Sequence, residues 1–258
     1  MKAAGKTIEV IDYPGQPHGF STGKGTPEAA QKFFEDSHAF FTRHISTQPT
    51  PLDESLIDRV PAESEEKPNQ LTTAEKEAGW KLLFDGNTTE GWRASGGDFF
   101  PDHRWTVEKG TLTRREGDER PRVDIITANQ FDNFELYWEW RIPSDGNSGL
   151  KYFISEERKG PIGHEYQIVG AERQSESNKP LRQNAALYDL LPAQGVVLMP
   201  PGVFNESRLI VKGNHVEHWL NGVKVLEYQL GSDRLNSAIA ASKFKAVEGF
   251  GTKFSTPI

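Results

Sequence analysis

Hydrophobic and polar residues alternate along most of the chain after Trp80, as they do in β-strands that bury one face. The clearest case is Phe134–Ile142, FELYWEWRI, in which every second side chain is apolar. Successive side chains of a strand point to opposite faces, so the polar row, which includes Glu139 and Arg141, lies opposite the apolar one. The pattern predicts a strand with one buried face and one polar face.

Glycine-containing turns divide this region into short strands. Residues 105–115, WTVEKGTLTRR, predict a hairpin that turns at Lys109–Gly110, and residues 208–228 predict three strands that turn at Gly213–Asn214 and Asn221–Gly222. An Asn-Gly pair favours the type I′ turn, because both central residues of that turn need a positive φ. Short strands joined in this way indicate a mainly β domain, either a sandwich or a barrel.

The first 46 residues follow a different pattern. Thr7–Tyr13 alternates β-branched and polar residues and predicts a strand, and the glycine- and proline-rich loop after it contains His18. Thr26 then offers a helix N-cap, a proline follows at the first helical position, and apolar residues recur at helical spacing as far as Ile45. We expect a strand, a loop and an amphipathic helix.

Between these two regions lies a segment rich in proline and acidic residues, which has the composition of a linker. Short helical turns are expected within it at Glu54–Asp58 and Thr73–Ala78. The chain is therefore predicted to contain three parts: a strand and helix segment at residues 1–46, a linker at 47–79 and a β domain at 80–258.

Composition narrows the range of partners. The chain has 258 residues, of which 35% are hydrophobic, enough for a sizeable core, and its net charge is −7. An acidic chain argues against nucleic acid as a partner. The sequence has no cysteine, no apolar signal region at its N-terminus and no apolar run near the roughly 18 residues of a membrane span. We expect neither a nucleic acid nor a membrane partner, and the oligomeric state and the compartment stay open.

A series of motifs in the β region gives a more specific indication. In chain order they are GWKLLFDGNTTEGW (79–92), WTVEKGTL (105–112), FDNFELYWEWRI (131–142), GNSGLKYF (146–153), HEYQIVG (164–170), ALYDLLPA (186–193) and VKGNHVEHWLNGVKVLEY (211–228). Together they resemble the 3-keto-disaccharide hydrolase family. The resemblance implies a concanavalin A-like jelly-roll β sandwich. Members of that family continue with further strands, so the sandwich is expected to lack its last strands here.

The N-terminal segment carries a second resemblance. Its strand, His-Gly loop and helix, with PHGF at residues 17–20, resemble the C-terminal end of an α/β-hydrolase of the dienelactone hydrolase type. In that fold this histidine belongs to a catalytic triad, but no nucleophile elbow G-x-S-x-G precedes it in the chain. His18 is thus expected to be an orphan triad histidine, and the chain a fragment of a bacterial fusion protein.

The resemblance to 3-keto-disaccharide hydrolases implies a carbohydrate-active hydrolase. Its substrates would be disaccharides or glycosides already oxidised to a ketone at C3. The ketone acidifies the C2 proton, so a general base can remove it and a cation can stabilise the enolate. The glycosidic oxygen then leaves C1 before water adds back. The E-x-D-x-x-E strand of ordinary jelly-roll glucanases does not occur in the chain, which agrees with a route other than two-carboxylate hydrolysis.

The candidate side chains come from HEYQIVG and the segments around it. Glu165 and Gln167 share one face of that strand. The predicted catalytic residues are Glu165 as base or metal ligand, Lys151 as enolate stabiliser and His218. The predicted substrate-binding residues are Gln167, Asn147, Ser148, Tyr188, Glu139 and Arg141. If the polar faces form the concave side of one sheet, these side chains line a sugar-binding groove.

Each candidate also has an ordinary structural explanation. A carboxylate or a lysine on a strand is often only solvated, Asn147 and Ser148 stand in a Gly-rich turn, and His218 lies on an apolar row. A divalent metal held by Glu165 with His164 and His218 is a further hypothesis. The metal requirement therefore stays unknown.

Two functional alternatives stay open beside the enzyme. The same fold serves as a noncatalytic lectin-like module, which would bind sugar without turnover. The chain could also be an inactive fragment of a hydrolase or esterase fusion. The parent protein would be periplasmic or extracellular, because substrates of this class are met outside the cytoplasm. A Glu165→Gln variant separates the enzyme from the binding module, since only the enzyme loses turnover.

Overall fold

The computed structural model describes two short strands near the N-terminus and residues 68–115, 123–158, 160–174 and 179–253. The chain divides into two compact units, Met1–Glu65 and Glu66–Ile258. In the first unit, β1 (Lys2–Ala3) pairs antiparallel with β2 (Lys6–Thr7). The second unit contains the remaining described elements.

Several predictions fall outside the described residues. They concern most of the strand at Thr7–Tyr13, the loop of His18, the helix that begins at Thr26 and the helical turn at Glu54–Asp58. The other predicted helical turn is confirmed as α2 (Thr73–Glu77). The Thr72 hydroxyl accepts the Glu75 amide at 3.2 Å, and the Glu75 carboxylate accepts the Thr72 amide at 2.8 Å. This capping box satisfies amides that the first turn would leave free.

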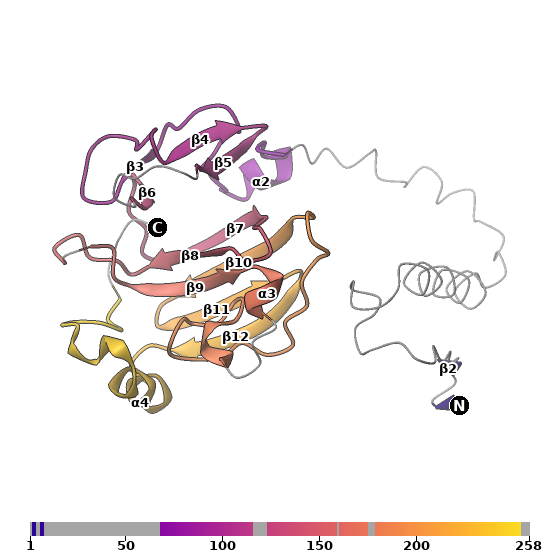
Figure 1. Cartoon of the computed structure of the whole chain (residues 1–258), viewed down its shortest axis with the longest axis vertical. Coiled ribbons are helices and arrows are strands. Elements are labelled where there is room, and N and C mark those ends of the chain that lie inside the picture. Colours follow the sequence, from indigo (N-terminus) through magenta and orange to yellow (C-terminus); the bar gives the residue numbers. More distant parts are fainter. Residues whose placement is uncertain are drawn as a thin grey trace. The chain divides into compact units, whose positions relative to one another are not determined.

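Four antiparallel strands form the main sheet of the second unit (Figure 1). In sheet order they are β12 (Val223–Gln229), β11 (His215–Leu220), β10 (Asn205–Lys212) and β7 (Phe134–Trp140). The first three form the predicted meander. Its second turn has φ values of 48° at Asn221 and 78° at Gly222, as a type I′ turn requires. The meander and this turn are confirmed.

The alternation predicted along β7 is also confirmed. Phe134, Leu136 and Trp138 are half-buried, Trp140 is buried, and the residues between them are exposed. β10 and β11 bury alternate residues in the same way. The main sheet therefore has an apolar face and a polar face.

A second layer covers the apolar face. It consists of β8 (Asn147–Tyr152) and β9 (His164–Val169), which pair antiparallel (Figure 1). The Tyr166 hydroxyl lies 2.9 Å from the Ser207 Oγ of β10, and the Trp140 indole N–H donates to the same Oγ at 2.8 Å. The first bond ties β9 to the main sheet through the core, and the second joins β7 to β10 at the same hydroxyl. Two facing layers of this kind are consistent with a β sandwich.

The remaining elements are short. Two further antiparallel pairs join β3 (Trp92–Ala94) to β6 (Ile125–Thr127) and β4 (Trp105–Glu108) to β5 (Thr111–Arg114). The helical segments are α3 (Ala171–Gln174), η3 (Pro180–Arg182), α4 (Asp233–Ala241) and η4 (Lys243–Ala246). The hairpin of β4 and β5 turns at Lys109 and Gly110, as predicted, and both residues have a positive φ.

The mainly β fold class is thus confirmed, whereas the jelly-roll order of strands stays a prediction. Among the described residues, no helix is long and apolar enough to cross a membrane. One part of the groove hypothesis is wrong, because β7 belongs to the main sheet and β8 with β9 forms a separate pair. The polar face of β7 and the polar face of β9 therefore cannot be one concave sheet.

Candidate functional site

The face of β8 and β9 that points away from the main sheet gathers most of the predicted polar residues. Lys151 on β8 lies directly opposite Glu165 on β9, and Gly149 lies opposite Gln167. Residues that pair directly in an antiparallel ladder share a face, so the Lys151, Glu165 and Gln167 side chains project together. The intervening residues of β9 point into the core. We call this surface the β8–β9 outer face.

Glu165 is the central group of the outer face. Its side chain is half-buried, and its carboxylate lies over Gly149, where a Cβ atom would overlap it. The glycine thus leaves the space that the carboxylate occupies. Burial raises the pKa of Glu165 above its usual value. A carboxylate that takes up a proton more readily than an ordinary one is suited to general base catalysis.

Two ammonium groups flank Glu165 from different elements. Lys151 forms an ion pair with Asp124, with Nζ and Oδ2 2.7 Å apart. Lys243, the first residue of η4, holds its Nζ 4.2 Å from the centroid of the Tyr188 ring. Both positive charges oppose the rise in the pKa of Glu165, whereas Asp124 adds to that rise. The outer face thus combines a proton acceptor with two cations that can stabilise a negative oxygen.

Tyr188 reaches the outer face because residues 184–188 run along the edge of β9 that β8 leaves free. The Tyr188 amide donates to the Glu165 carbonyl at 3.0 Å. The Asn184 side chain fixes the start of the segment, since it bonds both the amide and the carbonyl of Val169 at 2.8 Å. The segment therefore places Tyr188 next to Glu165 on the neighbouring backbone, with the Tyr188 ring against the Lys243 ammonium.

Two predicted amide residues also meet here. The Gln167 Nε2 donates to the Asn147 Oδ1 at 3.2 Å, and both side chains lie on the outer face. Gln167 is buried and Asn147 is exposed, so the pair joins the interior to the surface. Ser148 is exposed and alternates to the other face of β8. The structure brings Asn147 and Gln167 together with Glu165 and leaves Ser148 apart.

Glu139 and Arg141 lie elsewhere. Glu139 is exposed on the polar face of the main sheet, which is the opposite side of the two layers from Glu165. Arg141 places its guanidinium 4.8 Å from the centroid of the Phe204 ring and donates to the Gly202 carbonyl at 3.3 Å. Neither side chain lies on the β8–β9 outer face.

His218 points away from Glu165, because its side chain is fully buried between the two layers. Its Nε2 lies 2.6 Å from the Tyr152 hydroxyl and its Nδ1 lies 2.8 Å from the Ala185 carbonyl. His164 is buried in the same core. The hypothesis of a metal held by Glu165 with both histidines does not fit, since Glu165 lies on the other face of β9 from them.

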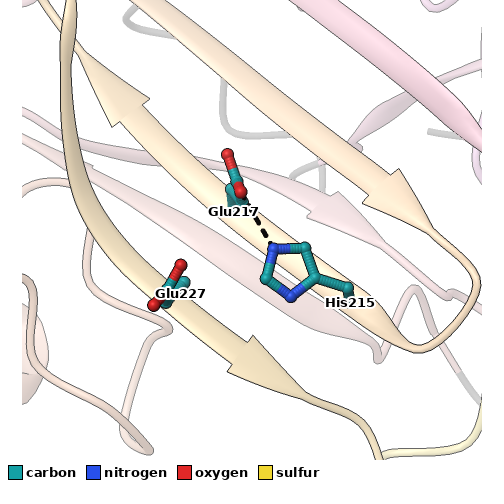
Figure 2. A group of neighbouring side chains, drawn as sticks. All are labelled: His215, Glu217 and Glu227. Atoms are coloured by element: carbon teal, nitrogen blue, oxygen red, sulfur yellow. Dashed lines mark hydrogen bonds and ion pairs between the residues drawn. The ribbon is translucent and has the colours of Figure 1, made fainter.

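A separate group of metal-type ligands lies on the polar face of the main sheet (Figure 2). His215 and Glu217 of β11 and Glu227 of β12 hold their ligand atoms within 4.8 Å of one another. Lys224 bonds to Glu227 and places its Nζ 3.6 Å from the Glu217 Oε1. The lysine therefore already supplies a positive charge beside the two carboxylates of this group.

Sequence reasoning missed two charged residues of the outer face, Asp124 and Lys243. Asp124 precedes β6, and Lys243 begins η4, so they stand far from the β8 and β9 motifs in the chain. No spacing pattern marks either of them. Only the folded arrangement brings them to Glu165.

Comparison with known proteins identifies related molecules. Residues 79–250 match the model of the 3-keto-alpha-glucoside-1,2-lyase-like domain. A 3-keto-disaccharide hydrolase of Bacteroides thetaiotaomicron is 33% identical over 186 residues, which cover 64% of this chain and 64% of that relative. A solved structure of a candidate glycosyl hydrolase from Parabacteroides distasonis superposes with a TM-score of 0.65 at 31% identity. The superposition covers 74% of this chain and 90% of that one.

Proposed function

Because the chain belongs to the family of 3-keto-alpha-glucoside-1,2-lyase-like domains, we propose that it cleaves glycosides or disaccharides whose sugar carries a ketone at C3. The relatives support a hydrolase-type domain. Within the proposal, residues 80–258 are the catalytic domain, 47–79 are a linker, and 1–46 resemble an α/β-hydrolase in a fusion.

The observation that carries the proposal is the environment of Glu165. A half-buried carboxylate with a raised pKa lies on a surface-facing sheet, and the positive charges of Lys151 and Lys243 act on it. This is the combination that removal of a proton next to a ketone requires: a base that can hold the proton, and positive charge near the oxygen that becomes an enolate.

The reaction then follows from these groups. The Glu165 carboxylate takes the C2 proton, and the electrons of the C2–H bond form the C1–C2 double bond as the glycosidic C1–O bond breaks. Charge that develops on the C3 oxygen is stabilised by Lys151 or Lys243. The leaving oxygen takes up a proton from solvent, and water adds back across the C1–C2 double bond, with its proton delivered to C2. Atoms and charge balance without an external oxidant.

Neighbouring groups would orient the sugar. The Gln167 and Asn147 amides both donate and accept, which suits sugar hydroxyls. The Tyr188 ring offers an apolar face on which a sugar ring can stack. Among the described residues, the group of three metal-type ligands lies on the polar face of the main sheet and not at Glu165, and Asp124 is paired with Lys151. The proposal therefore assigns the positive charge to lysines and routes no step through a metal.

The test uses the full chain and 4-nitrophenyl glucosides of both anomers oxidised at C3, with release of nitrophenolate as the readout. The unoxidised glucosides serve as the substrate control. Glu165→Gln should lower kcat by roughly a hundredfold or more, because the amide cannot accept the proton. The matched control is Glu206→Gln, an exposed glutamate on the other side of the two layers. Equal activity of the two variants would contradict the assignment.

The lectin-like alternative predicts a different pair of results. A binding module would hold the oxidised glucoside without releasing nitrophenolate, and Glu165→Gln would leave its affinity nearly unchanged. Titration calorimetry of the wild type and the Glu165→Gln variant with the oxidised sugar therefore separates the enzyme from the binding module.

A further inference from the structure

A chain of buried hydrogen bonds runs beneath the outer face, between the two layers. Its members are His164, Tyr228, Tyr152 and His218, and each is at most 5% exposed. The His164 Nδ1 lies 2.7 Å from the Tyr228 hydroxyl, which lies 2.8 Å from the Tyr152 hydroxyl. The Tyr152 hydroxyl lies 2.6 Å from the His218 Nε2. The three strands β8, β9 and β12 thus meet β11 through polar groups in an otherwise apolar core.

The direction of every bond in this chain can be worked out from its last member. The Ala185 carbonyl can only accept, so the His218 Nδ1 carries the hydrogen in the 2.8 Å bond to it. Burial lowers the pKa of His218 to about 4, so the ring is neutral and its Nε2 must accept from Tyr152. Tyr228 must then donate to Tyr152, and His164 must donate to Tyr228.

The series of hydrogen bonds ends at His164. Since the His164 Nδ1 donates, its Nε2 is a bare acceptor, and this buried atom has no hydrogen-bond partner among the described residues. Burial lowers the pKa of His164 to about 3, which keeps the ring neutral. Every hydrogen bond in the series therefore runs in one direction, from His164 as donor towards the Ala185 carbonyl as final acceptor, and both histidines share the Nδ1–H tautomer.

The end at Ala185 leads to the candidate site. Ala185 has a φ of 60°, a left-handed conformation that is unusual for a residue with a side chain. Its amide donates to the Gln167 carbonyl at 2.9 Å, which holds the 184–188 segment along β9. Three residues later, Tyr188 bonds the Glu165 carbonyl and supports the Lys243 ammonium.

We propose that His218 is a positioning residue, whose Nδ1–H holds the strained Ala185 carbonyl and thereby fixes Tyr188 and Lys243 beside Glu165. The inference rests on the proposed function, because it gives Lys243 a part in stabilising the enolate. Tyr152 keeps the required His218 tautomer by donating to its Nε2. A buried histidine thus acts on the outer face without touching a ligand there.

The tautomer can be measured on the unaltered protein. Long-range proton–nitrogen correlation spectra distinguish the Nδ1–H from the Nε2–H form of each histidine. We expect His164 and His218 both as neutral Nδ1–H rings at neutral pH. A His218 ring that carries its hydrogen on Nε2 would overturn the inference, because it could not donate to Ala185.

Kinetics separate positioning from simple support of the core. His218→Leu removes the donor, whereas His218→Asn places an amide N–H close to the Nδ1 position. We expect His218→Leu to lower kcat roughly ten- to a hundredfold with KM nearly unchanged, and His218→Asn to recover most of kcat. Val225→Ala, a buried change on β12, is the control for loss of stability alone. Equal kcat values for the two His218 variants would overturn the inference.

A milder variant covers the case in which His218→Leu does not fold. Tyr152→Phe leaves His218 in place but removes the donor to its Nε2, so the ring should populate both tautomers and kcat should fall. An unchanged kcat in Tyr152→Phe would contradict the role. Failure of the proposed function is distinguishable, because it appears as an active Glu165→Gln variant, whereas failure here leaves Glu165→Gln inactive.

Discussion

Acid should destabilise the folded protein well before its carboxylates are protonated, because two histidines are buried neutral. Burial holds the pKa of His164 at about 3 and that of His218 at about 4, against 6.5 for an ordinary histidine. Above that ordinary value neither state binds the proton, and stability is unaffected. As pH falls below it, the unfolded chain takes up two protons that the folded chain refuses. The unfolding free energy therefore falls as the pH drops below 6.5, until the pH reaches the pKa values of the two histidines in the folded state.

The size of the effect follows from the distance below the ordinary pKa. At about pH 5 each histidine costs about 2 kcal/mol of unfolding free energy, and the pair about 4 kcal/mol. Glu165 works in the opposite direction, since its raised pKa lets the folded state take up a proton first. The lowered pKa values of Asp85 and Glu156 reduce stability only near and below the ordinary carboxylate range. The histidines therefore dominate the first part of the acid range.

Urea unfolding at a series of pH values measures this loss. The wild-type unfolding free energy should fall between pH 7 and pH 5, and His218→Asn should remove about half of the slope, because the amide does not titrate. His164→Asn should remove the other half. A pH slope that both variants leave unchanged would show that the protons are taken up by groups other than His164 and His218.

Three further changes test the outer face and its surroundings. Gly149→Ala puts a Cβ where the Glu165 carboxylate lies, so kcat should fall roughly ten- to a hundredfold, and unchanged steady-state kinetics would contradict the packing. Lys243→Met removes a charge that lowers the pKa of Glu165, so the acid limb of the kcat/KM profile should move to higher pH; a limb that stays in place would exclude the contact. Glu156→Gln breaks a partly exposed pair with Arg93 and should cost less than about 1 kcal/mol in urea unfolding, and a larger loss would show that the pair is more than a surface contact.

Local rules predicted much of the fold. The period of two along β7 and the Asn-Gly turn at Asn221–Gly222 depend only on neighbouring residues, and both are confirmed. Alternation also predicted His218 on the apolar face of its strand, and its side chain is buried there. These features needed no knowledge of the partner strands.

The arrangement of the layers could not be predicted in the same way. Alternation shows which side chains share a face of one strand, but not which strands share a sheet, so Glu139 and Glu165 were expected in one groove. Asp124 and Lys243 reach Glu165 only through long-range packing, and no local pattern marks them. The hydrogen bond from His218 to Ala185 likewise depends on a segment 33 residues away.

Removal of the C2 proton by Glu165 can be followed through the hydrogen at C2. The 3-keto glucoside is cleaved in deuterium oxide, and the product is examined by NMR, with a sample lacking enzyme as the measure of spontaneous exchange. If Glu165 removes the C2 proton, the wild-type product carries deuterium at C2, and Glu165→Gln binds the sugar without forming that product. A product that keeps its original C2 hydrogen would contradict the account, because the glycosidic bond would then break without any step at C2.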